Sequence, residues 1–460
     1  MSDEKNQNII KTQDDHQPIE FEQVTDKEGN FKCKGDIFAS WTAKDSEFDI
    51  KTLRSRIEPW LTALFQSEHL SLLAGSGLTH AVHCLAADKG AAGMDAVVWP
   101  DDYADPIKQK AKASADKAGR KEGNLEDQLR IANELLRGLE IVDDGEADSL
   151  KQKIISTLDE FSSDILKSER NIATSETKKR EQAFNILVTF LMSFASRTGT
   201  RDRLNIFTTN YDRLIEAGAE LAGLHLLDRF VGNLTPLFRS SRLDLDMHYN
   251  PPGIRGEPRY LEGVARFTKL HGSLDWVQSD DDIRRIGLPF GVDEIEPYLK
   301  APGLHDATSH QLMIYPNAAK DRETADYPYV ELFRDLAAAI CRPNSTLVTY
   351  GYSFGDEHIN RIIRDMLTIP STHLVIISYN DPLDRIMKMY KSLGRPSQIS
   401  LLIGPELSEL ARLTEHFLPK AAIDKTTFRM GELLQRRMGA EGRQNNEEQQ
   451  SKEAQQGDES

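Results

Sequence analysis

The fold is decided by the stretch LSLLAGSGLT, which runs from Leu70 to Thr79. Its first half is a short apolar run, which is typical of a strand buried on both faces of a parallel sheet. Its second half is rich in glycine, and helical spacing follows as far as Ala87. The stretch therefore predicts a buried strand that turns sharply into a helix.

The same pattern recurs along the chain. Further strands are predicted at 204–208, 267–270, 346–350, 374–378 and 399–403, and helices at 124–139, 154–166, 183–195, 211–222, 356–367, 382–393 and 406–417. Short apolar strands that alternate with amphipathic helices predict an α/β protein with a doubly wound, mostly parallel, Rossmann-like sheet. We expect a partly disordered N-terminal extension (1–50), a main domain (51–420) with a helical insert at about 90–200, and a C-terminal helix and disordered tail (421–460).

Composition excludes several classes of protein. No window approaches the roughly 18 to 20 continuous apolar residues of a membrane-spanning helix, so we expect no membrane association. The N-terminus lacks the pattern of a secretory signal, and only three scattered cysteines occur, Cys33, Cys84 and Cys341. We therefore expect a cytoplasmic protein without a disulfide framework or a four-cysteine zinc site.

The net charge of −16 is concentrated in the two ends of the chain. Residues 1–30 hold eight acids and three bases, and residues 441–460 hold six acids and two bases. A mildly acidic body does not favour direct binding of nucleic acid. The basic stretch at 108–121 is interpreted as a solvated helical or mobile insert rather than a nucleic-acid contact.

Polar and glycine residues follow the predicted strands, at the edge where doubly wound sheets bind ligands. After the first strand, Gly75 and Gly77 would let the backbone approach a diphosphate, and Ser76 and Thr79 offer hydroxyl donors beside a helix N-terminus. A tight strand-to-helix turn in any α/β protein looks the same, so this turn alone does not establish nucleotide binding.

The later strand ends carry more reactive groups. Thr208, Thr209, Asn210 and Asp212 follow the second strand, where Asn210 is either a site residue or the N-cap of the next helix. His271 follows the third strand, where it is either placed for proton transfer near neutral pH or bonded to a loop. The candidate site is completed by Gly351 and Ser353 after the fourth strand and by Asn380, a cap or a ribose-facing amide, after the fifth.

In this order the motifs resemble those of the sirtuin family, in its divergent bacterial antiphage-defence branch. The family's diphosphate turn is similar to Gly75–Thr79, its T-x-N-x-D signature to Thr208, Asn210 and Asp212, its H-G-S signature to residues 271–273, and its G-x-S loop to residues 351–353. Residues 124–127 resemble a helix opening of the divergent branch. The resemblance covers about residues 70–418.

The resemblance implies NAD as a substrate, but the chain departs from the deacetylating members. Their I-P-D-F-R element and the two C-x-x-C pairs of their zinc module are missing, so no metal is expected. The implied activity is NAD glycohydrolysis, in which His271 takes a proton, Asn210 holds the water or ribose, and Asp212 stabilises the developing cation or only begins a helix. The alternatives are an NAD or ADP-ribose sensor without turnover, and a protein deacylase or ADP-ribosyl transferase.

An enzyme that destroys NAD must be silent until it is triggered. The resemblance implies that the regulator is another polypeptide or an assembly of this chain. We therefore expect a homo-oligomer and a partner that is a HerA-type ATPase or helicase. The N-terminal segment and the inserts at roughly 90–122 and 143–178 are the candidate contact surfaces, and Ile9, Ile10, Ile19 and Phe21 could dock on a partner.

Overall fold

The computed structural model describes residues 7–12, 15–25, 27, 29–34, 41–42, 46–91, 99, 101–117, 123–197, 202–241, 246–249, 259–279, 282–304, 307–308, 311–312 and 327–420. The chain divides into two compact units, Met1–Leu418 and Pro419–Ser460. The described helices and strands belong to the first unit. The C-terminal helix and tail expected at 421–460 lie outside the described residues.

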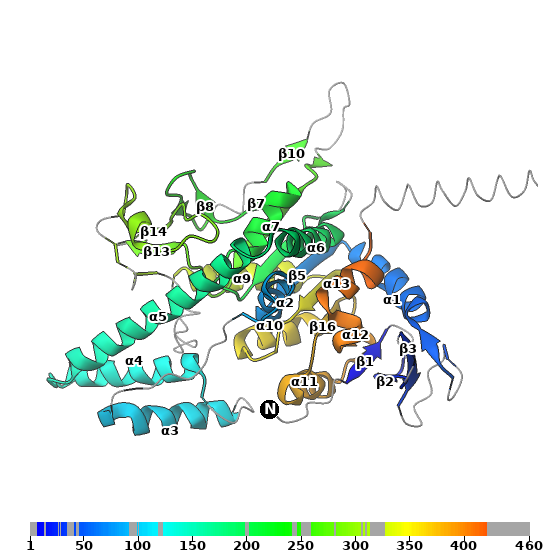
Figure 1. Cartoon of the computed structure of the whole chain (residues 1–460), viewed down its shortest axis with the longest axis horizontal. Coiled ribbons are helices and arrows are strands. Elements are labelled where there is room, and N and C mark those ends of the chain that lie inside the picture. The colour runs from blue at the N-terminus through cyan, green and yellow to red at the C-terminus, as the bar shows by residue number, and fades with distance from the viewer. Residues whose placement is uncertain are drawn as a thin grey trace, which may run out of the picture. The chain divides into compact units, whose positions relative to one another are not determined.

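An 11-stranded sheet, in the order β4-β3-β2-β1-β17-β16-β15-β5-β6-β12-β7, organises the described part of the first unit (Figure 1). The strands from β17 to β7 are parallel, and those from β4 to β17 are antiparallel. Their bounds are β1 Asn8–Lys11, β2 Ile19–Gln23, β3 Asn30–Cys33, β4 Phe48–Asp49, β5 His69–Ala74, β6 Asn205–Thr208, β7 His225–Leu227, β12 Val264–Lys269, β15 Ser345–Tyr350, β16 His373–Ser378 and β17 Ile399–Ile403.

Helices cover both faces of this sheet. One face packs against α1 Ile50–Phe65, α2 Ser76–Ala87, α6 Thr177–Ala195, α7 Leu214–Ala222, α12 Pro405–Ser408, α13 Leu410–Arg412 and the π-helical turn η6 Leu413–Phe417. The other face packs against α9 Tyr329–Ile340, α10 Glu357–Leu367 and α11 Arg385–Leu393, and short 3-10 turns η4 Pro382–Asp384 and η5 Pro396–Gln398 precede α11 and β17. The predicted doubly wound, mostly parallel α/β fold is confirmed.

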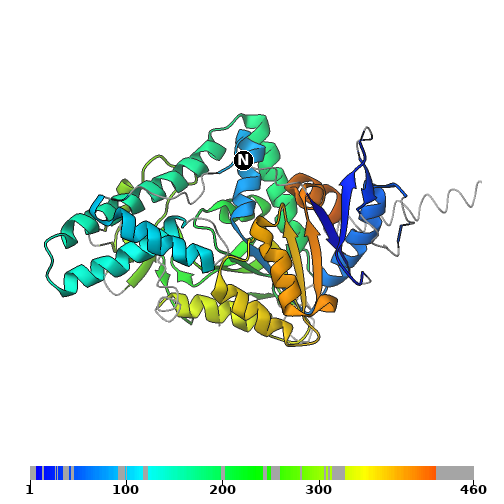
Figure 2. The ribbon, with the colours of Figure 1, turned by 90° about the horizontal axis from the view of Figure 1, so that it is seen from below.

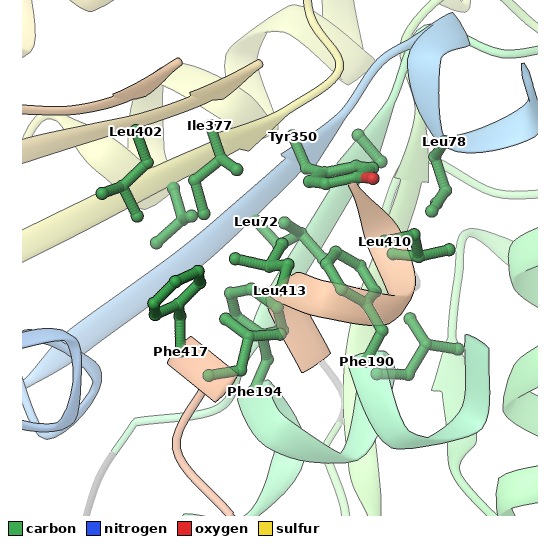
Figure 3. Close-up of a cluster of buried hydrophobic side chains, with 14 of the residues drawn as sticks. Leu72, Leu78, Phe190, Phe194, Tyr350, Ile377, Leu402, Leu410, Leu413 and Phe417 are labelled. Atoms are coloured by element: carbon green, nitrogen blue, oxygen red, sulfur yellow. The ribbon is translucent and has the colours of Figure 1, made fainter. Parts of the chain in front are cut away.

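Successive side chains of the central strands point alternately into the hydrophobic cores on the two faces of the sheet, because a strand has a period of two residues. Leu72 and Tyr350 lie in the core beneath α6, whereas Leu73 lies in the core beneath α9. In the first core the ring centroids of Phe190 and Tyr350 are 5.0 Å apart, and those of Phe190 and Phe194 are 5.1 Å apart (Figure 3). Each such fully buried side chain stabilises the fold by about 1.5–3 kcal/mol.

The N-terminal segment contributes four strands to the main sheet. β1 pairs with β17, so that Ile9 lies opposite Ile403 and Ile10 opposite Leu402. Lys11 is buried, and its Nζ donates to the carbonyls of Pro396 (2.6 Å) and Ile399 (3.0 Å). The apolar residues expected to be available to a partner (Ile9, Ile10, Ile19 and Phe21) are instead buried in the chain's own sheet.

Three helices from the range predicted as a helical insert form a group of their own: α3 Asp101–Lys117, α4 Leu125–Ile141 and α5 Ala147–Ala173. A fourth helix of that range, α6, packs on the main sheet instead. The three grouped helices lie side by side, away from β1–β3 (Figure 2), and enclose a core that includes Leu129, Ile154 and Leu158. α4 begins with a capping box, in which Asn124 and Asp127 satisfy each other's backbone N–H groups. The basic stretch predicted at 108–121 lies in α3 as far as Lys117, and residues 118–122 lie outside the described residues.

A second, antiparallel sheet follows the order β13-β14-β9-β8, and two further strands form a separate pair, β10-β11. The bounds are β8 Phe230–Val231, β9 Leu237–Phe238, β10 His248–Tyr249, β11 Arg259–Tyr260, β13 Trp276–Ser279 and β14 Asp282–Arg285, with a 3-10 turn η2 at Glu296–Lys300. Within the described ranges, no helix has the length and apolarity to cross a bilayer. In the same residues, no three His, Cys, Asp or Glu side chains gather as metal ligands.

Candidate functional site

The candidate residues lie at one edge of the main sheet, where its parallel strands end. Ala74, at the end of β5, is aligned with Thr208 of β6 and Tyr350 of β15. Lys269, at the end of β12, is aligned with Thr208. After β5 the chain adds β6, β7 and β12 on one side and later β15, β16 and β17 on the other. The strand order therefore reverses at β5, and doubly wound sheets bind ligands at such a reversal.

The turn after β5 packs directly on the loop after β15. The Gly75 N–H donates to the Tyr350 carbonyl (2.9 Å), and the Gly77 N–H donates to the Gly351 carbonyl (3.1 Å). A Cβ on Gly77 would lie 2.6 Å from Gly351 Cα, and a Cβ on Gly75 would lie 2.5 Å from the Gly351 carbonyl oxygen. The glycines predicted to admit a diphosphate are thus required for the contact between these two loops.

Replacing Gly351 with alanine should lower the free energy of unfolding by at least about 2 kcal/mol. Its φ of +61° strains any other residue, and its Cβ would meet the backbone of Gly77 at 2.6 Å. Gly394→Ala is the matched control, because Gly394 has a φ of +60° and no atom of the described residues within 4 Å of the added Cβ. Urea unfolding of both variants measures the difference, and equal losses would contradict the steric argument.

Asn210 is buried after β6, and its amide nitrogen donates to the Gly75 carbonyl (3.0 Å) and to Thr79 Oγ1 (2.9 Å). Its backbone N–H donates to Thr208 Oγ1 (3.1 Å), and Thr208 Oγ1 donates to the Ala74 carbonyl (2.9 Å). The side chain therefore does not cap the next helix, since α7 begins at Leu214. Instead, it ties the end of β6 to the turn after β5.

Asp212 uses both carboxylate oxygens within the fold. Its Oδ2 accepts from Thr79 Oγ1 (2.6 Å), and its Oδ1 accepts from the Leu214 N–H (3.0 Å). The Thr79 hydroxyl, predicted to be a donor for a diphosphate, donates to Asp212 in this structure. Asp212 thus helps to begin α7, which is the helix-start alternative considered from the sequence, and it also anchors Thr79.

Lys269, a buried lysine, holds the loop that carries Asp212. The Lys269 Nζ donates to the backbone carbonyl of Asp212 (2.5 Å) and to Glu216 Oε1 (2.9 Å). Burial raises the pKa of Glu216 to about 7, against the opposing effect of Lys269. Lys269 is not among the candidates predicted from the sequence, although a lysine directly before Leu270-His271, at the end of a predicted strand, is a visible signal.

His271 lies at the end of β12, which pairs directly with β6. Its Nε2 is 2.9 Å from Asp356 Oδ2, and the two side chains are 18% and 5% exposed. Its ring centroid is 6.4 Å from that of Tyr211. The loop-contact alternative for His271 is therefore partly correct, but the partner is a carboxylate. From the sequence, Asp356 is read only as the start of a helix.

The remaining candidates are less closely connected. Thr209 is half-buried, and its N–H donates to the Ala74 carbonyl (3.3 Å). Ser353 is half-buried in the loop before α10, whereas Ser76 and Asn380 are exposed. Among the described residues, no side-chain hydrogen bond links these last three to the Asn210 and Asp212 cluster.

Two of the cavities among the described residues lie at different positions relative to the candidate site. A cavity of about 550 Å³ is lined by Asn344, Thr346 and His373, at the amino ends of β15 and β16 and thus at the sheet edge opposite the candidate site. A cavity of about 10 Å³, the size of a single water, is lined by Glu216 and Lys269 among others. Of these two, the smaller one adjoins the loop that carries Asp212.

Comparison with known proteins gives one match. Residues 204–394 match the family model described as the SIR2-like domain. No curated protein matches the chain. The matched range is less than half of the chain; it includes Asn210, His271 and Asp356, and it begins after the Gly75–Thr79 turn. The chain therefore contains a SIR2-like region, which supports a sirtuin-like family and an NAD-related function.

Proposed function

We propose that the chain is an NAD glycohydrolase, which cleaves NAD to nicotinamide and ADP-ribose. The observation that carries the proposal is the placement of Asn210 and His271. They follow two directly paired strands, β6 and β12, beside the strand at which the sheet order reverses. Both residues also lie within the SIR2-like range.

The reaction needs a held ribose and one activated water. The water oxygen bonds to ribose C1′ while the C1′–N1 bond to nicotinamide breaks, and the electron pair of that bond neutralises the pyridinium. His271 accepts the proton of the water. Both amide hydrogens of Asn210 are directed to the Gly75 carbonyl and Thr79 Oγ1, so its amide oxygen is the group left to accept from water or a ribose hydroxyl.

The proposal includes a biological role, in which the enzyme acts in antiphage defence by depleting NAD. It also includes regulation, in which the chain forms a homo-oligomer that is controlled by a HerA-type ATPase. A surface that supports such an interaction lies at the tip between α4 and α5. There Ile141 is 77% exposed and Val142 is 69% exposed. Contiguous exposed apolar surface is a common mark of contact sites, and these two neighbouring side chains contribute to such a surface.

The direct test is release of nicotinamide and ADP-ribose from NAD by the purified full chain, followed by chromatography. Parallel reactions add an acylated lysine peptide or a HerA-type ATPase. Release without the peptide is the expected result, and release that needs the ATPase would add regulation by assembly.

Two outcomes would overturn the proposal. Cleavage that proceeds only with the acylated peptide, and that transfers the acyl group to ADP-ribose, would identify a deacylase. NAD that binds in calorimetry but stays intact under every condition would identify a sensor.

A further inference from the structure

The contact between His271 and Asp356 joins two distant parts of the chain. His271 follows β12, and Asp356 precedes α10 on the far side of β5. The Nε2 to Oδ2 distance is 2.9 Å, and the Asp356 side chain is 5% exposed. A buried carboxylate that bonds one ring nitrogen decides which nitrogen carries the proton.

Asp356 is held in place by α10. Its Oδ1 accepts from the backbone N–H groups of His358 (2.9 Å) and Ile359 (3.3 Å), so it is the N-cap of this helix. Its backbone carbonyl lies 3.3 Å from the Tyr352 hydroxyl, which also contacts Asn360. The helix N-terminus favours a negative charge at this position. The carboxylate is therefore fixed and, when ionised, can only accept hydrogen bonds.

We propose that Asp356 is a positioning residue for His271: it holds the proton on Nε2 and leaves the lone pair of Nδ1 for the water. The inference rests on the proposed NAD glycohydrolase function and names the reacting nitrogen within it. Asp356 does not touch the substrate in this scheme. It acts by fixing the tautomer and the ring orientation of His271.

Two variants separate this role from helix capping. Asp356→Ser keeps a good N-cap, but its shorter side chain does not reach His271. Asp356→Asn keeps the size and the cap, but its amide has one acceptor oxygen instead of two. Both should lower kcat for NAD cleavage at least about tenfold, part of the roughly 10²- to 10⁴-fold contribution of a general base, with little change in KM.

A cap elsewhere in the chain provides the matched control. Asp49 caps α1 by accepting from the Thr52 N–H (2.9 Å), on an element outside the site. Asp49→Ser makes the same substitution at a helix N-cap and should leave kcat and KM unchanged. Equal kcat values for the Asp356 variants and the wild type would overturn the proposal.

Nuclear magnetic resonance identifies the tautomer of His271 without any need for NAD cleavage. In the full chain with ¹⁵N-labelled histidine, the two ring nitrogens give distinct chemical shifts, and the signals missing in His271→Gln assign the residue. We expect a single Nε2–H form in the wild type and a mixed population in Asp356→Ser. A wild type that carries the proton on Nδ1 would overturn the proposal.

The experiments distinguish failure of the proposed function from failure of the positioning role. A wild type that never cleaves NAD would reject the glycohydrolase function, while the nitrogen shifts still show whether Asp356 fixes His271. Normal cleavage by both Asp356 variants would reject the positioning role alone.

Discussion

Replacing His271 with glutamine should lower kcat for NAD cleavage by about 10²- to 10⁴-fold, the usual contribution of a general base. Glutamine keeps polar atoms in the side chain but cannot take a proton from water. The 18% exposure of His271 leaves part of the ring accessible at the sheet edge where the substrate is proposed to bind. The measurement is the initial rate of nicotinamide release at saturating NAD.

The matched control is His225→Gln, because His225 is exposed on β7 and lies outside the site. It should retain the wild-type rate. His271→Gln should also unfold at a temperature close to that of the wild type, so that lost activity is not lost structure. Unchanged release by this variant would remove His271 from the chemistry. Asn210→Ala is a weaker test, since it also breaks the bonds that tie β6 to the turn after β5.

Replacing Glu169 with alanine should lower the free energy of unfolding by about 3–5 kcal/mol, because it leaves a buried charge without its partner. Glu169 lies on α5 and forms an ion pair with Arg213; the two side chains are 2% and 7% exposed. Its Oε1 also accepts from the Arg213 backbone N–H (2.7 Å). Burial opposes both charges: it raises the pKa of Glu169, whereas for Arg213 the carboxylates of Glu169, Asp275 and Glu216 outweigh burial and raise the pKa.

An exposed ion pair that also involves a residue of α5 serves as the control. Arg170 bonds Asp293 at 2.7 Å, but their side chains are 52% and 64% exposed. Arg170→Ala should therefore change the free energy of unfolding by less than about 1 kcal/mol. Urea unfolding at one pH compares the two variants. A small loss for Glu169→Ala would show that the buried pair does not hold the loop after Asp212 to the helical insertion.

The sequence predicted the parallel part of the sheet well, for a physical reason. Strands buried on both faces are short runs of mainly apolar residues, as in β5, β16 and β17, and amphipathic helices separate them. Once those strands are parallel, their ends meet at one edge, which is why Gly75, Asn210 and Gly351 come together. This much depends on local pattern and topology, and both are visible in the chain.

The remaining features depend on contacts between distant residues. β1 and β2 are short, and their burial becomes evident only when β1 is placed against β17. The strands of the second sheet are two to four residues long, too short for a period to be read. The pairings of His271 with Asp356 and of Glu169 with Arg213 join separate elements, so no spacing indicates them. In the sequence Asp356 matches the pattern of a helix N-cap, and nothing there indicates its further contact with His271.

The pairing of β1 with β17 also bears on the order of events during synthesis. Lys11 and Ile399, whose side chain and carbonyl bond, are 388 positions apart in the chain. Because a ribosome makes a chain from the N-terminal to the C-terminal direction, β1 emerges long before β17, its neighbour in the sheet. Until then the early strands carry unpaired edges, which are open to aggregation. The pairing of β1 with β17, and the burial of Lys11 that depends on it, can therefore form only after β17 has been translated.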